Sequence, residues 1–130
     1  MTNEEYGRYV DALAPRSKTG KNLLNAFWVG GLICAIGQAL LNGYQALGLD
    51  ETTAGAAVSI SLVLLSAILT GFAVYDDIAK FAGAGTLVPI TGFANAVVAP
   101  AIEFQTEGFV LGTAAKMFTI AGPVIVYGLS

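Results

Sequence analysis

The stretch FAGAGTLVPITGFANAVVAPAIEFQTE, residues 81–107, decides the fold of this chain. It is apolar enough to enter a lipid bilayer, yet it contains glycines, prolines, threonines and an asparagine. Glycine and proline interrupt helices, and freed backbone groups are tolerated at membrane depth only where protein or a water-filled cavity satisfies them. A broken segment with scattered polar residues is therefore typical of a permeation or substrate path. The candidate path residues in it are Gly83, Gly85, Thr86, Pro89, Thr91, Asn95 and Glu103.

The composition indicates a membrane protein. Of the 130 residues, 55% are hydrophobic and 12% are charged, against roughly 25% charged residues in a soluble domain. The small net charge of −3 argues against a nucleic-acid partner. The chain has no histidine and a single cysteine, Cys34, which excludes an intrachain disulfide, a Cys/His metal cluster and histidine-based catalysis. We therefore expect no enzyme activity, no metal site and no cofactor.

Four apolar runs predict the membrane segments. Residues 23–41 and 54–74 are long enough to cross the hydrocarbon core as helices. The apolar runs 81–104 and 108–129 follow them. The predicted fold class is an all-α membrane protein with about four membrane segments, of which 81–104 is broken or re-entrant. The last run reaches Ser130 without a polar flank, so we expect the natural chain to continue beyond it.

A short interfacial helix is predicted at the N-terminus. Thr2 and Glu5 have the spacing of a capping box. Apolar side chains recur at helical spacing through residues 2–14, and Pro15 ends the pattern. Such a helix lies either at the lipid interface or in solvent.

Basic residues predict the orientation of the chain. Residues 1–22 form the predicted tail and carry four basic side chains, whereas the connection 43–53 carries none. Because lysine and arginine are enriched in cytoplasmic loops, we expect the N-terminus in the cytoplasm. Residues 23–130 are expected to form a single membrane domain.

The first two predicted spans each carry a stripe of small and polar residues. Gln38 and Asn42, further candidates for the solute path, belong to the stripe of the first span. Ser66 and Thr70 belong to the stripe of the second. Such stripes are expected where they face one another or a pore, and ordinary helix packing is the alternative explanation.

Charged residues lie beside and within the predicted spans. Lys116, the last path candidate, lies about 12 Å into its span by helix rise. We expect it either to find a carboxylate among Glu103, Glu107, Asp76 and Asp77 or to snorkel to the interface. The candidate vestibule charges are Asp76, Asp77, Lys80 and Glu107, and a solvated loop cluster is the alternative interpretation of them. Gly108 and Gly112 form a GxxxG pair, which close helix packing explains.

Four stretches of the sequence resemble a known family. They are FWVGGLICAIGQAL (27–40), LTGFAVYDDIAKFAGAG (69–85), PITGFANAVV (89–98) and EGFVLGTAAKMFTIAGPVIVYG (107–128). Through them the chain is identified as a member of the SpoVAC/SpoVAEb family of SpoVA membrane proteins. The non-membrane N-terminus and the TGFAN form favour its AC type over its AE type.

The resemblance implies a function and a place in the cell. It implies a subunit of a membrane channel for dipicolinic acid, carried as the calcium chelate into the developing endospore and released at germination, with mechanosensitive behaviour. The implied location is the inner (forespore) membrane of an endospore-forming bacterium. The implied partners are further copies or other SpoVA proteins, especially the AE-type paralogue, together with membrane lipid and dipicolinate with or without Ca²⁺. The alternative is a non-conducting structural or assembly subunit of a spore membrane complex.

Overall fold

The computed structural model describes residues 2–13 and 18–130, and within these residues all regular structure is helical. Three helices are long and apolar enough to cross a membrane, and a shorter apolar helix accompanies them. The predicted all-α membrane fold is confirmed. Pro15, the predicted end of the first helix, lies outside the described residues.

The first helix, α1 (Asn3–Leu13), begins with the predicted capping box. The Thr2 amide donates to Glu5 Oε2 at 2.8 Å, and the Glu5 amide donates to Thr2 Oγ1 at 3.3 Å. These two bonds satisfy backbone donors that the first turn of a helix leaves free. None of the residues of α1 is buried.

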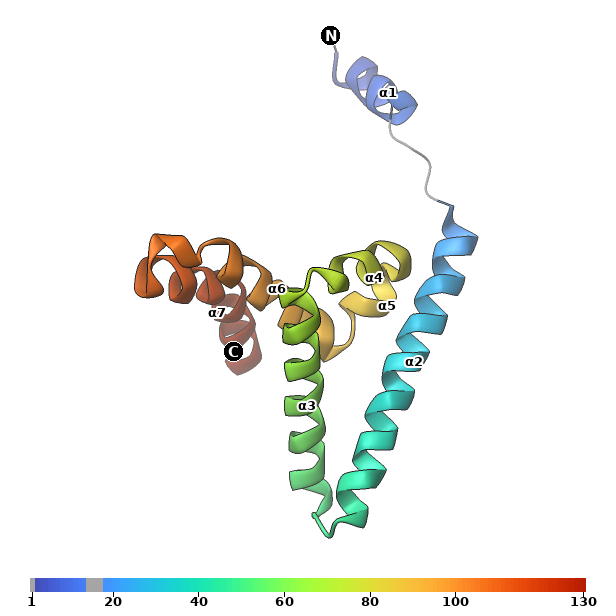
Figure 1. Ribbon diagram of the computed structural model, residues 1–130. Coiled ribbons are helices and arrows are strands. Elements are labelled where there is room, and N and C mark those ends of the chain that lie inside the picture. The colour runs from blue at the N-terminus through green and yellow to red at the C-terminus, as the bar shows by residue number, and fades with distance from the viewer. Residues whose placement is uncertain (1, 14–17) are drawn as a thin grey trace.

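Helices α2 (Thr19–Ala46) and α3 (Glu51–Gly71) form a hairpin with splayed arms. The arms meet at the short connection before Asp50, whose side chain caps α3 by accepting from the Thr53 amide at 3.2 Å. Near this closed end Tyr44 and Ser61 share a hydroxyl hydrogen bond of 2.7 Å. Figure 1 shows the arms diverging from the connection toward the opposite end, which leaves room between them.

The broken segment fills the open end of the hairpin. The predicted segment 81–104 starts at the end of α4 (Val74–Ala82) and continues through the single turn α5 (Ala84–Leu87) and α6 (Ile90–Glu103). Positive φ angles of 58° at Ala73 and 53° at Gly83 reverse the chain on either side of α4. Figure 1 shows α4 and α5 between the upper parts of the two arms.

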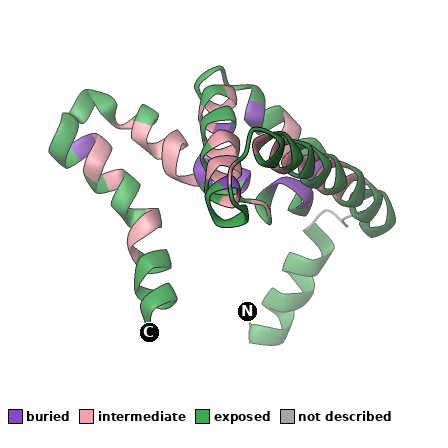
Figure 2. Ribbon diagram, turned by 90° about the horizontal axis from the view of Figure 1, so that it is seen from below, coloured by how far each residue is buried: buried purple, intermediate pink, exposed green. Residues whose placement is uncertain are grey.

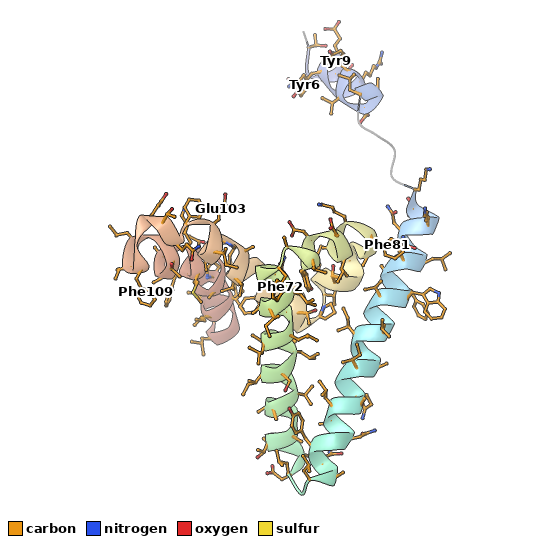
Figure 3. All side chains as sticks on the ribbon, viewed as in Figure 1. Tyr6, Tyr9, Phe72, Phe81, Glu103 and Phe109 are labelled. Carbon is orange, nitrogen blue, oxygen red and sulfur yellow. The ribbon has the colours of Figure 1, made fainter. Side chains whose placement is uncertain are left out.

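The broken segment is re-entrant. Ser66 Oγ donates to the Thr91 carbonyl at 2.6 Å, and Thr70 Oγ1 donates to Asn95 Oδ1 at 2.8 Å. Both bonds join residues 25 positions apart, so the first turns of α6 run in the same direction as the last turns of α3, and α6 continues past the end of α3. Figure 3 shows Phe81 and Glu103, near the two ends of the segment, at the same end of the hairpin as Phe72.

The C-terminal part folds back from the end of α6 through η1 (Gln105–Glu107), a 3₁₀ turn, and η2 (Phe109–Ala114), a π-helical turn that continues into α7 (Ala115–Leu129). Gly108 starts η2 with a φ of 102°. A Cβ on the buried Gly112 would meet the Phe104 carbonyl oxygen and would lie 3.1 Å from Glu107 Cβ. Gly112 therefore packs against the preceding turn, where the sequence predicted a contact between helices, while a Cβ on Gly108 would meet nothing within 4 Å.

Candidate functional site

Four buried hydroxyl side chains surround the tip of the re-entrant segment, by which we mean residues 83–92, from the end of α4 to the first turn of α6. They come from four different helices and are Ser66, Tyr75, Thr86 and Thr91. Figure 2 shows buried residues gathered where α3 meets this segment. Sequence reasoning named Thr86 and Thr91 as path candidates but missed Tyr75, whose phenol beside two aspartates in an otherwise apolar stretch was the available signal.

Three of these hydroxyls donate to backbone carbonyls near the helix breaks. Tyr75 donates to the Thr86 carbonyl at 3.0 Å, and Thr86 Oγ1 donates to the Gly83 carbonyl at 3.0 Å. The bond from Ser66 to the Thr91 carbonyl does the same at the start of α6. An irregular backbone at membrane depth needs such partners, since the surrounding lipid offers none. Among the described residues, Thr91 Oγ1 is the buried side-chain oxygen that has no hydrogen-bond partner.

Two glycines allow backbone to pack directly on backbone at the tip. A Cβ on Gly85 would meet the Ala26 carbonyl oxygen of α2 and would lie 2.9 Å from Ala26 Cα. A Cβ on Gly92 would meet the Thr86 carbonyl oxygen and would lie 2.7 Å from the Leu87 carbonyl oxygen. Only glycine fits at these two positions without moving the main chain. Pro89 provides the extended N-cap residue of α6, with φ −66° and ψ 162°.

A cavity of about 190 Å³ lies between the hairpin arms beside the tip. The four hydroxyl residues contribute to its lining, but leucine, isoleucine and valine side chains of α2 and α3 form most of the wall. Apolar walls of this kind offer water few hydrogen-bond partners. Between the arms the tip therefore faces a mainly apolar cavity, while a second hollow of about 330 Å³ beside α2 is lined in part by Gly85 and Pro89.

An acidic depression lies at the end of the hairpin where the segment enters and leaves. Asp76 of α4 and Glu103 of α6 line the same hollow of about 180 Å³, together with Thr70. Thr70 also donates to Asn95 Oδ1 of α6. The fold thus brings one predicted vestibule charge, Asp76, and one predicted path residue, Glu103, to a single place.

The other predicted vestibule charges are exposed. Lys80 Nζ lies 3.3 Å from Asp77 Oδ1 one helical turn away, and both side chains are more than two-thirds exposed. Such surface pairs contribute little to stability. Asp77 and Lys80 therefore form a solvated cluster, as the alternative interpretation of these charges expects. Glu107 is also exposed, beside Gly112.

Lys116 has an aromatic partner. Its Nζ lies 3.9 Å from the centre of the Phe104 ring, a cation–π contact. Within the part of the chain that the structure describes, the only ion pair is the one between Asp77 and Lys80. The prediction that Lys116 pairs with a carboxylate is therefore wrong within a single chain. The turn at Gln105–Glu107 brings the Phe104 ring over the ammonium group instead.

Gln38 and Asn42 lie apart from the re-entrant tip. Gln38 Nε2 donates to Asn42 Oδ1 at 2.9 Å, and both side chains are exposed on α2. Ser66 and Thr70 of α3 instead contact α6. The two stripes therefore do not face one another. The α3 stripe packs against α6, which is the helix packing of the alternative explanation.

These features define a small all-α membrane protein in which a splayed helical hairpin holds a glycine-rich re-entrant segment. The sequence matches the family described as SpoVAC/SpoVAEB sporulation membrane protein over residues 22–130. It is 50% identical over 132 residues to stage V sporulation protein AC of Bacillus subtilis (strain 168), an alignment that covers 99% of this chain and 88% of that protein. No solved structure matches the chain. The chain belongs to the SpoVAC/SpoVAEB family of sporulation membrane proteins.

Proposed function

We propose that this protein is a subunit of a membrane channel for dipicolinic acid, carried as the calcium chelate. Uptake into the developing endospore and release at germination, both across the inner forespore membrane, are the processes that it would serve. The proposal starts from membership of a sporulation membrane family. The observation that carries it further is the re-entrant segment, whose irregular backbone lies between two apolar spans. Transport proteins use such interrupted segments to bind and pass solutes.

The charge of the membrane domain favours a neutral permeant. Residues 23–130 contain six acidic side chains and two lysines, and two of the acids, Asp76 and Glu103, line the depression beside the segment. Exposed carboxylates repel a dicarboxylate dianion by Coulomb interaction. A one-to-one chelate of dipicolinate with Ca²⁺ has no net charge, so the same carboxylates oppose it far less.

Gating in this proposal is a movement of the re-entrant tip. The tip contacts α2 through the close approach of Gly85 to Ala26 and contacts α3 through the bond from Ser66. Membrane tension that draws the splayed arms apart would loosen the first of these contacts. The mechanosensitive behaviour that the family resemblance implies would then follow from the shape of the hairpin.

The test is solute flux through vesicles that contain the purified protein. Dipicolinate efflux is measured with and without Ca²⁺ and with and without osmotic tension. We expect efflux in the presence of Ca²⁺ that rises with tension. We also expect the variant Gly85→Leu to change efflux, while Gly43→Leu, on an open face of α2, does not. Efflux equal to that of empty vesicles under every condition, with the AE-type paralogue also present, would refute the channel.

The alternative is a structural or assembly subunit that does not conduct. The close packing of Gly85 on Ala26 and the mainly apolar cavity between the arms favour this second candidate. The same vesicles decide between the two, because a scaffold leaves efflux unchanged while still binding its partner subunits. Neither proposal gives the protein a catalytic role.

A further inference from the structure

The outward face of α2 carries amide side chains at membrane depth. Gln38 lies eight residues before Ala46, the end of α2, or about 12 Å along the axis by helix rise. At 100° per residue it points about 120° away from Tyr44, which bonds to α3. The mutual bond of Gln38 and Asn42 uses one amide hydrogen and one carbonyl oxygen. The Gln38 carbonyl and the Asn42 amide group have no partner among the hydrogen bonds of the described residues.

The outward residues repeat with the spacing of a helix–helix seam. From Leu24 the exposed positions advance by alternating steps of four and three residues, the a and d spacing of a left-handed coiled coil. We call them the α2 seam: Leu24, Trp28, Gly31, Ala35, Gln38 and Asn42. Small residues at its centre permit close approach of a second helix, and amides bond across such contacts in membranes.

We propose that the α2 seam is the contact between two copies of this chain, packed as parallel helices. Copies inserted in the same orientation have parallel α2 helices, and each presents the same free carbonyl of Gln38 and free amide of Asn42. The face is therefore complementary to itself in hydrogen bonding and carries no charge that would repel a like face. An asparagine in such a seam also fixes the register of the two helices.

The surface area of the chain leaves room for this contact. The structure exposes 9499 Å², whereas a compact monomer of 13.3 kDa exposes about 6,500 Å². Part of the excess belongs to α1, none of whose residues is buried. The remainder includes α2, a helix of 28 residues that also has no buried residue. A stable interface buries about 1,600 Å² in total, which lies well within the excess.

Disulfide cross-linking in membranes tests the inference. Single cysteines are placed in a Cys34→Ser background at the seam position Ala35 and at Ile36, which is 41% exposed but lies about 100° round α2, toward the cavity between the arms. The protein is expressed without other SpoVA proteins and oxidised before detergent is added. We expect a dimer band for Ala35→Cys and none above background for Ile36→Cys. Equal yields at both positions, or no dimer at either, would overturn the inference.

Substitution of the amide pair gives a second readout. Each interhelical hydrogen bond in a membrane contributes about 0.6 kcal/mol and at most about 1.7 kcal/mol, which corresponds to roughly a 3- to 18-fold change in the dimerisation constant. The variant Gln38→Leu should therefore weaken dimerisation by this factor, measured by energy transfer between labelled copies, while Ile36→Ala, on the side of the cavity between the arms, should not. Unchanged dimerisation in Gln38→Leu would show that the amide side chains form no hydrogen bonds across the contact, against this inference.

The inference deepens the proposed channel function, which needs more than one copy, but its failure is distinguishable. Solute flux without a seam cross-link would retain the channel and refute this interface. A seam cross-link without flux would retain the interface and favour the scaffold. Cysteines at the seam that react with water-soluble maleimide but do not cross-link would overturn the inference and assign the face to a water-filled path.

Discussion

The close approach of α5 to α2 leaves no room for added volume at Gly85. A single methyl group on Gly85 would lie 2.9 Å from Ala26 Cα and nearer still to the Ala26 carbonyl oxygen. Both neighbours are main-chain atoms, so no side chain rotates to make room and the two helices must separate. Overpacking of this kind costs about 1–3 kcal/mol, offset in part by the roughly 0.5–1 kcal/mol that alanine gains over glycine within a helix.

The effect of Gly85→Ala is measured as a change in unfolding free energy. SDS titration in mixed micelles, followed through the fluorescence of Trp28, the single tryptophan, gives the transition. Two variants in α2 calibrate it. A Cβ on Gly30 would lie 3.4 Å from the Gly85 carbonyl oxygen, and a Cβ on Gly43 would meet nothing within 4 Å. We expect Gly43→Ala to be the most stable of the three variants, Gly30→Ala to be intermediate and Gly85→Ala to be the least stable. A Gly85→Ala transition that coincides with that of Gly43→Ala would refute the packing of the tip against α2.

Three further predictions concern single positions. Ala73 has a φ of 58°, which is unfavourable for alanine by about 1–2 kcal/mol, so Ala73→Gly should raise the SDS concentration of unfolding. Lys116→Met and Phe104→Leu should show a coupling of about 0.5–2 kcal/mol in a double-mutant cycle. Additive effects of these two substitutions would refute the cation–π contact, and the control Lys80→Met should change stability little. Hydrogen bonds from Thr53 lower the pKa of Asp50, so its stabilising effect is present above the ordinary aspartate pKa and is lost as the pH falls through the lowered value. In Asp50→Asn this part of the acid sensitivity should be absent from pH-dependent unfolding curves.

Local sequence signals predicted the elements well. The apolar runs 23–41 and 54–74 correspond to α2 and α3, because length and hydropathy alone select a membrane helix. The Thr2–Glu5 capping box formed as its spacing predicts. Gly83 separates α4 from α5, and Pro89 stands at the start of α6, whereas Gly85 and Gly92 lie inside helices. Pro100, by contrast, lies inside α6 without ending it.

Features that depend on tertiary contacts were beyond the sequence. The direction of α6 follows from its parallel packing on α3, through the two bonds from Ser66 and Thr70 to residues 25 positions away. The contact of Lys116 with Phe104 depends on the turn at Gln105–Glu107, whose path has no periodic signal. The sequence identified the stripe of Gln38 and Asn42 correctly as a face, but which neighbour a face meets depends on the position of every other helix.

The re-entrant path of the broken segment is the central claim of this account, and side-specific labelling tests it most directly. Single cysteines at Asp77 and Gln105, exposed positions on either side of the segment, are compared with Thr2→Cys and Thr52→Cys in a Cys34→Ser background. A membrane-impermeant maleimide should label Asp77→Cys and Gln105→Cys from the same side as Thr2→Cys, in the cytoplasm, and Thr52→Cys from the opposite side. Labelling of Gln105→Cys together with Thr52→Cys would show that the segment crosses the bilayer and would contradict the account.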